Sequence, residues 1–146
     1  MTREAPALTP EEDALVAAAL AARQRAYAPY SRFQVGAAIL TTAGEIVAGC
    51  NVENVSYGLT NCAERTAVFA ACAAGKLDGT GAGPAIRAVA VVAEGAAPPS
   101  PCGACRQVLH EFGPGCLVIM ATPGGTRRVR GLDELLPDAF GPWQGM

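Results

Sequence analysis

The sequence predicts an α/β fold, a three-layer α/β/α sandwich on a mixed five-stranded sheet. Apolar runs of strand length alternate along the chain with segments of helical pattern, which is typical of a sheet covered by helices. The chain has 146 residues, of which 51% are hydrophobic, enough for one substantial core. We therefore expect a single catalytic domain over residues 1–146, with residues 1–8 as a loose N-terminal tail.

Four segments carry helical signals: residues 10–26, 61–74, 103–112 and 132–136. In the first, Thr9 is a suitable N-cap, Pro10 takes the first helical position, and Glu12 completes a capping box. In the second, Asn61 is the expected N-cap.

Five segments are predicted to be strands: residues 34–41, 45–51, 87–92, 116–121 and 127–129. The first two form a hairpin, because a turn at Ala43-Gly44 joins them. The third is a continuous apolar run of the kind found in buried strands. The last is expected at the sheet edge.

Composition excludes some partners. The net charge is −2, and the basic residues cluster only at Arg127, Arg128 and Arg130. A nucleic-acid polymer is a poor substrate candidate, because phosphate binding normally requires a basic stripe. The alanine-rich residues 15–22 are too short for a membrane span and follow acidic residues, so we expect no membrane segment, no signal peptide and a cytoplasmic protein. The apolar content suggests that subunits also bury surface between them.

Two cysteine motifs indicate a catalytic zinc site. Cys62-Ala63-Glu64 is followed, after a gap, by Pro101-Cys102-Gly103-Ala104-Cys105. A catalytic zinc has three protein ligands and keeps a water, whereas a structural zinc is closed by four ligands. The combination is the three-cysteine form of the zinc deaminase signature, in which the glutamate moves protons and is not a ligand.

The residue types suit the replacement of an aromatic amine by a carbonyl. That reaction needs a nucleophile at neutral pH, and zinc lowers the pKa of a bound water to about 7. A carboxylate beside the water can take a proton and return it to the leaving amine, and Glu64 is the only acid inside the motif. Arg65, three residues after Cys62, is expected to offset the negative charge of the thiolates.

Other uses of the cysteines are weaker interpretations. A Cys-x-x-Cys pair alone can be a redox pair. A structural zinc could be closed by Cys50, Cys116 or His110. Six cysteines could also form disulfides, but a chain of this length does not need them, and zinc thiolates suit a reducing compartment.

Several sequence blocks are shared with one family. They are Tyr30-Ser31-x-Phe33-x-Val35-Gly36-Ala37-Ala38, Gly49-Cys50-Asn51-Val52-Glu53-Asn54, Cys62-Ala63-Glu64-Arg65-Thr66-Ala67, Pro101-Cys102-Gly103-Ala104-Cys105-Arg106-Gln107 and Glu134-Leu135-Leu136-Pro137. With these blocks the chain, from about residue 27 to 142, resembles the short-form cytidine deaminases. The resemblance implies one zinc ion per subunit, held by Cys62, Cys102 and Cys105, with Glu64 moving protons between water, ring N3 and the leaving amine.

The resemblance also implies substrate contacts. Asn51 and Glu53 would bind the ribose, which fits a polar pair at the end of an apolar strand. Phe33 would lie against the base, although core packing explains it equally well, and the Ala63 N–H would meet the pyrimidine carbonyl. The family's short form is a homotetramer, which would bring Tyr57 and Phe140 to a neighbour's pocket. A surface tyrosine and a tail anchor are the simpler interpretations of those two residues.

The predicted function is hydrolytic deamination of free cytidine and 2′-deoxycytidine in pyrimidine salvage. One alternative is a deaminase of a nucleoside-like antibiotic such as blasticidin S. Another is a zinc-bearing protein that binds nucleosides without turnover. The retention of Glu64 argues against the last, because a pure binder gains nothing from an acid at the open zinc position.

Overall fold

A computed structural model describes residues 7–77 and 84–141 and confirms the predicted fold class. The sheet has the strand order β2-β1-β3-β4-β5. The elements are α1 (Pro10–Arg23), β1 (Val35–Thr41), β2 (Ile46–Cys50), η1 (Tyr57–Leu59), α2 (Ala63–Ala73), β3 (Ile86–Ala93), α3 (Gly103–Phe112), β4 (Leu117–Ala121), β5 (Arg127–Gly131) and α4 (Leu132–Leu135). In the described ranges, every helix is too short or too polar to cross a membrane.

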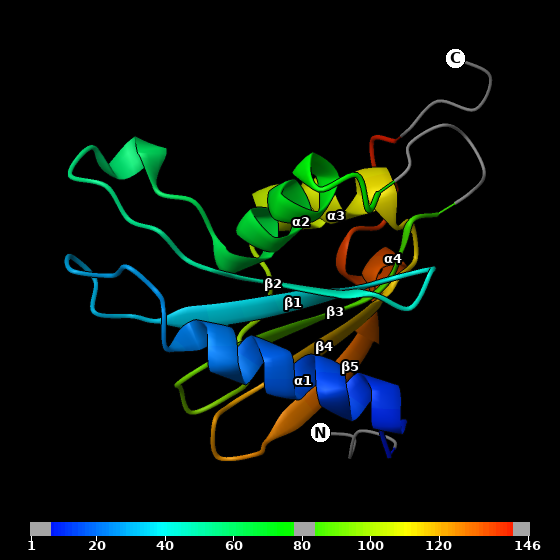
Figure 1. Cartoon of the computed structure of the whole chain (residues 1–146), viewed down its shortest axis with the longest axis horizontal. Coiled ribbons are helices and arrows are strands. Elements are labelled where there is room, and N and C mark those ends of the chain that lie inside the picture. Colours follow the sequence, from blue (N-terminus) through cyan, green and yellow to red (C-terminus); the bar gives the residue numbers. More distant parts are fainter. Residues whose placement is uncertain (1–6, 78–83, 142–146) are drawn as a thin grey trace.

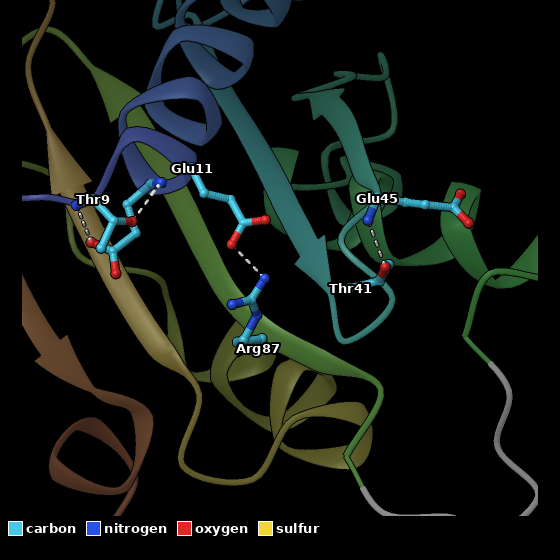
Figure 2. Close-up of polar contacts among 6 residues, drawn as sticks. Thr9, Glu11, Thr41, Glu45 and Arg87 are labelled. Atoms are coloured by element: carbon cyan, nitrogen blue, oxygen red, sulfur yellow. Dashed lines mark hydrogen bonds and ion pairs between the residues drawn. The ribbon is translucent and has the colours of Figure 1, made fainter.

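The sheet is mixed because one strand pair is parallel. β3 and β4 run parallel, and α3 forms the crossover between them, as a parallel pair requires. The pairs β1–β2, β1–β3 and β4–β5 are antiparallel. The β1–β2 hairpin turns at Gly44, whose φ of 88° favours glycine, and the Glu45 N–H bonds to Thr41 Oγ1 at 3.0 Å (Figure 2).

Helices cover both faces of the sheet. Figure 1 shows α1 on one side and α2, α3 and α4 on the other. Alternate strand residues point to opposite faces, so each face has its own core. Ala38, Leu40 and Val92 pack with the α1 side, whereas Ile39 and Val91 belong to the core under α2 and α3.

The start of α1 follows the sequence prediction, but its end does not. Thr9 and Glu12 form the capping box, with bonds of 3.2 and 3.0 Å, and Glu11 pairs with Arg87 on β3 (Figure 2). The predicted end at residue 26 is wrong. After Arg23 the amides bond three residues back, as in Ala26 N–H to Arg23 O at 3.2 Å, so the α-helical pattern stops.

The predicted N-terminal tail falls mainly on residues 1–6, outside the described residues. Within them, Leu8 is half-buried and packs against the core on the α1 side of the sheet.

Glycine allows α2 to lie directly on the sheet. A Cβ at Gly49 of β2 would lie 2.5 Å from the Ala67 backbone nitrogen, closer than any real Cβ contact. The helix that begins beside the cysteine site is therefore fixed against β2 by backbone contact. A larger residue at position 49 would push α2 away from the strand.

Candidate active site

Two helices begin at the site with a cysteine as N-cap. Cys62 precedes α2 and Cys102 precedes α3, both with extended backbone and neither using its side chain to cap the helix. The predicted N-cap at Asn61 is wrong by one residue, since the Asn61 amide instead donates to Thr66 Oγ1 at 3.0 Å. Because neither thiol is engaged in capping, both sulfurs are available to a ligand.

The three predicted ligands come together. The Sγ atoms of Cys62 and Cys102 are 3.9 Å apart, those of Cys102 and Cys105 are 3.5 Å apart, and all three lie within 4.8 Å of one another. With Zn–S bonds of about 2.3 Å, tetrahedral geometry places thiolates roughly 3.8 Å apart. The sulfur spacing therefore fits a zinc ion held by three thiolates.

Among the described residues, Cys62, Cys102 and Cys105 are the cysteine, histidine and acidic side chains that come close enough together to hold a metal ion. Cys50, Cys116 and His110, considered above as a fourth ligand, are not among them. All six cysteines are free thiols, so the disulfide interpretation finds no pair in the structure. Three protein ligands leave a position for water or substrate, as in catalytic zinc sites.

Hydrogen bonds prepare Cys62 as a thiolate. Hydrogen bonding with Cys105, assisted by Arg65, lowers the pKa of Cys62 to about 5. The Arg65 guanidinium donates from Nη2 to Cys62 Sγ at 3.1 Å. The pKa of Cys105 is raised, first by its hydrogen bond with Cys62 and then by burial, so without metal Cys62 ionises first.

Glu64 lies in the first turn of α2 and is only 4% exposed. Burial raises the pKa of its carboxyl, and the neighbouring negative charge of Cys62 raises it further. A carboxyl in this environment holds a proton more readily than one in water, which suits a group that must accept and return protons.

The chain beyond β2 brings Glu53 to the loop before β1. One carboxylate oxygen, Oε1, accepts the N–H groups of Tyr30 at 2.9 Å and Ser31 at 3.1 Å. The other, Oε2, accepts the Ser31 hydroxyl. These bonds, led by the Ser31 hydroxyl, lower the pKa of Glu53. Its carboxylate is therefore held in one orientation.

Asn51 faces the same loop but is 8% exposed. Its Oδ1 accepts the Val35 N–H and its Nδ2 donates to Phe33 O, both at 2.8 Å. An amide nitrogen has two hydrogens and a carbonyl oxygen two lone pairs, so each atom keeps one further bonding position for a sugar hydroxyl.

The remaining predicted contacts differ in exposure. Phe33 is 47% exposed, so its side chain is outside the core, and core packing no longer explains it. Ala63 is buried at the first position of α2, where the N–H has no partner within the helix. A cavity of about 240 Å³ opens beside Glu53, and its lining is Tyr30, Ser31, Glu53, Tyr57 and Thr60.

Both residues predicted to approach a neighbouring subunit lie on the surface. Tyr57 is 74% exposed, with its ring 5.7 Å from that of Tyr30 in an edge-on arrangement. Phe140 is 69% exposed, and its carbonyl accepts Gln107 Nε2 at 2.6 Å.

Two residues that organise the site were quoted in the sequence blocks without a role. Ser31 bonds Glu53, as described. Arg106 donates to Pro101 O and Leu135 O, each at 2.7 Å, and to Ser100 Oγ at 2.8 Å, and so fixes the loop that carries Cys102. The only signal for either was its place beside a site residue within a shared block.

Comparisons with known proteins agree with this geometry. Residues 9–121 match the profile of the cytidine and deoxycytidylate deaminase zinc-binding region. A cytidine deaminase of Halalkalibacterium halodurans is 49% identical over 127 residues, covering 86% of this chain and 91% of that protein. The crystal structure of a cytidine deaminase from Burkholderia pseudomallei has a TM-score of 0.82 and 52% identity, covering 91% of this chain and 100% of that one. A blasticidin-S deaminase of Bacillus cereus is less similar, 30% identical over 115 residues, covering 73% of this chain and 76% of that protein.

Proposed function

Because the chain belongs to the zinc-dependent cytidine deaminase family, we propose that it hydrolyses free cytidine and 2′-deoxycytidine to uridine and 2′-deoxyuridine. Water supplies the new carbonyl oxygen at C4 of the pyrimidine, the C4–N bond breaks, and ammonia leaves. Salvage of pyrimidine nucleosides is the role that fits this reaction. A single catalytic domain over residues 1–146, in a reducing cytoplasm, accommodates both the reaction and its free thiols.

Cys62, Cys102 and Cys105 would hold the zinc ion. When bound, zinc supplies a water that is activated at neutral pH. Arg65 orients Cys62 and offsets part of the thiolate charge through its 3.1 Å hydrogen bond. The N-termini of α2 and α3 add favourable dipoles for the same negative charge.

Glu64 is the proposed proton carrier. Its carboxylate accepts a proton from the attacking water and delivers it to N3 of the pyrimidine ring. It then helps to protonate the leaving amine. Its burial supports this role, because burial raises the pKa of the carboxyl, which therefore holds a transferred proton more readily than a carboxyl in water does.

Other residues would bind the substrate. Glu53 accepts hydrogen bonds from ribose hydroxyls, and Asn51 can both accept from them and donate to them. Phe33 contacts the base, and the Ala63 N–H donates to the pyrimidine carbonyl. The exposed ring of Phe33 and the cavity beside Glu53 support these assignments.

The observation that carries the proposal is the group of three thiols with the buried Glu64 beside it. The test is an absorbance assay of cytidine turnover by purified protein, before and after removal of metal by a chelator. Activity that disappears with the metal and returns with zinc supports the function. A zinc-loaded protein that binds cytidine without turnover would instead be a nucleoside-binding protein.

Blasticidin S is included in the same assay. The weaker match to a blasticidin-S deaminase and the Asn51–Glu53 pair both favour nucleoside substrates. Faster turnover of blasticidin S than of cytidine would reverse that preference.

We also propose a homotetramer in which subunits share active sites. Half of the chain is hydrophobic, and the exposed aromatic residues Tyr57, Phe69 and Phe140 provide surface for subunit contacts. Light scattering at micromolar protein concentration measures the mass of the assembly, which should be that of four subunits. Phe140→Ala tests sharing: a raised KM for cytidine with an unchanged unfolding temperature supports it, whereas unchanged KM and mass contradict it.

A further inference from the structure

Ser31 connects the carboxylate of Glu53 to the backbone of Phe33. Its hydroxyl donates to Glu53 Oε2 and accepts the Phe33 N–H at 3.0 Å. Its own N–H donates to Glu53 Oε1 at 3.1 Å. No other residue in the described ranges makes two hydrogen bonds to this carboxylate.

The bonds around Glu53 restrict what it can still accept. A carboxylate offers about four lone-pair positions. Three are occupied by the Tyr30 amide, the Ser31 amide and the Ser31 hydroxyl. One position therefore remains, at a carboxylate that lines the cavity of about 240 Å³. Removal of the Ser31 hydroxyl would free Oε2, and the carboxylate could then turn away from a ligand.

The backbone next to Ser31 is held in an unusual shape. Arg32 has a φ of 57°, in the left-handed region that non-glycine residues seldom adopt. The hydrogen bond from the Phe33 N–H to Ser31 Oγ joins the two residues on either side of Arg32. The carbonyl of Phe33 accepts a second hydrogen bond, from Asn51 Nδ2 at 2.8 Å. The position of Phe33 thus depends on Ser31, which also bonds the Glu53 carboxylate, and on Asn51.

We propose that Ser31 is a positioning residue that sets the enzyme's preference for ribose hydroxyls by holding the Glu53 carboxylate toward the sugar. This inference rests on the proposed function, because it takes Glu53 as the group that binds the ribose. Ser31 itself acts through Glu53. A purely structural role would weaken turnover of every cytosine nucleoside alike.

The experiment compares kcat/KM for cytidine and for 2′,3′-dideoxycytidine, which lacks the 2′ and 3′ hydroxyls of the ribose and keeps the 5′ hydroxyl. Turnover of cytidine by the wild type tests the proposed function before any variant is considered. In Ser31→Ala, the ratio of the two kcat/KM values should fall about tenfold, the size of effect expected for one hydrogen bond to a charged group. The kcat/KM of Ser31→Ala for the dideoxy substrate should fall much less than its kcat/KM for cytidine.

Three further variants complete the design: a control, Glu53→Gln, and the double variant of Glu53→Gln with Ser31→Ala. Ser56→Ala is the matched control, since Ser56 makes no side-chain capping bond, and its ratio should equal that of the wild type. In Glu53→Gln, the ratio of the two kcat/KM values should already be low, and adding Ser31→Ala should lower it no further. An unchanged ratio in Ser31→Ala would overturn the inference, and so would a further fall in the double variant, because Ser31 would then act independently of Glu53.

Discussion

The Arg65 guanidinium lies 3.1 Å from the sulfur of Cys62, three residues before it on the same side of α2. The contact joins a fixed positive charge to the thiol of the N-cap residue of the helix, whose side chain makes no capping bond. Hydrogen bonding and electrostatic attraction to Cys62 and Cys105 raise the pKa of Arg65, so the guanidinium and the cysteine group stabilise each other's charges. Metal binding and this arginine are therefore linked.

Replacing Arg65 by Gln should weaken zinc binding about 10- to 100-fold, the usual effect of losing a group that orients a metal ligand. The physical reason is that Arg65 is one of the groups that lower the pKa of Cys62. Chelator competition measures the zinc affinity directly. Arg25→Gln, at an exposed arginine near the end of α1, is the control and should bind zinc as the wild type does. Equal affinity in both variants would contradict the role of Arg65.

Replacing Glu64 by Gln should leave zinc content and fold unchanged. The value of kcat should fall about 10²- to 10⁴-fold, the typical contribution of a general acid–base group. The amide is nearly the same size but cannot carry a proton. Steady-state kinetics and elemental analysis measure both properties on one preparation. Glu111→Gln, at an exposed position of α3, should keep full activity. Near-normal kcat in Glu64→Gln would remove this residue from the mechanism.

Local signals in the sequence explain the parts of the fold that were predicted well. The α3 boundaries 103–112 are confirmed, because Cys102 has the extended backbone of an N-cap and Gly113 follows the last turn. The capping box of Thr9 and Glu12 places the start of α1. Cys102 and Cys105 could be placed together because residues at i, i+3 spacing at a helix start have nearly fixed relative positions. Cys62, 40 residues away, was joined to them by the zinc deaminase signature.

The parts that were missed depend on contacts between distant residues. The bonds from Ser31 to Glu53 span 22 residues and the bond from Arg106 to Leu135 spans 29, and no local pattern encodes either. Asn61 was expected to cap α2 on propensity alone, but its amide bonds Thr66 and leaves the cap to Cys62. Here tertiary bonding decides between neighbouring residues with similar local preferences.

Glu53 should give the enzyme a measurable pH-dependent stability. Its pKa is lowered from 4.5 in the folded state, mainly by the Ser31 hydroxyl. A lowered pKa means that the unfolded state binds the proton more tightly, so the carboxylate stabilises the fold above pH 4.5 and this contribution is lost as the pH falls through the folded pKa. The unfolding temperature of the wild type should thus exceed that of Glu53→Gln at neutral pH.

The difference in unfolding temperature between the wild type and Glu53→Gln should shrink as the pH falls below 4.5. Thermal unfolding of both proteins in the same buffers measures it, and any loss of zinc at acid pH affects both alike. Glu111→Gln should show no comparable trend relative to the wild type. A difference that stays constant, or that grows in acid, would show that the Glu53 carboxylate is not stabilised by its hydrogen bonds.

Cys116 should resist alkylation in the folded protein. Its side chain lies in the core under α2 and α3, and it is 5% exposed. Burial raises its pKa to about 12. At pH 8 only about one molecule in 10⁴ would carry the reactive thiolate, which is the form that alkylating reagents attack. Cys72, on the outer face of α2, is exposed and provides the comparison within the same chain.

In zinc-loaded protein treated with iodoacetamide, peptide mass spectrometry should find Cys72 labelled first and Cys116 unlabelled, with zinc protecting Cys62, Cys102 and Cys105. Denaturant should then allow Cys116 to react as quickly as Cys72, because unfolding restores both access and an ordinary thiol pKa. Cys72→Ser should remove the fast label without exposing Cys116. Rapid labelling of Cys116 in the folded protein would mean that the core beneath α3 opens on the timescale of the reaction.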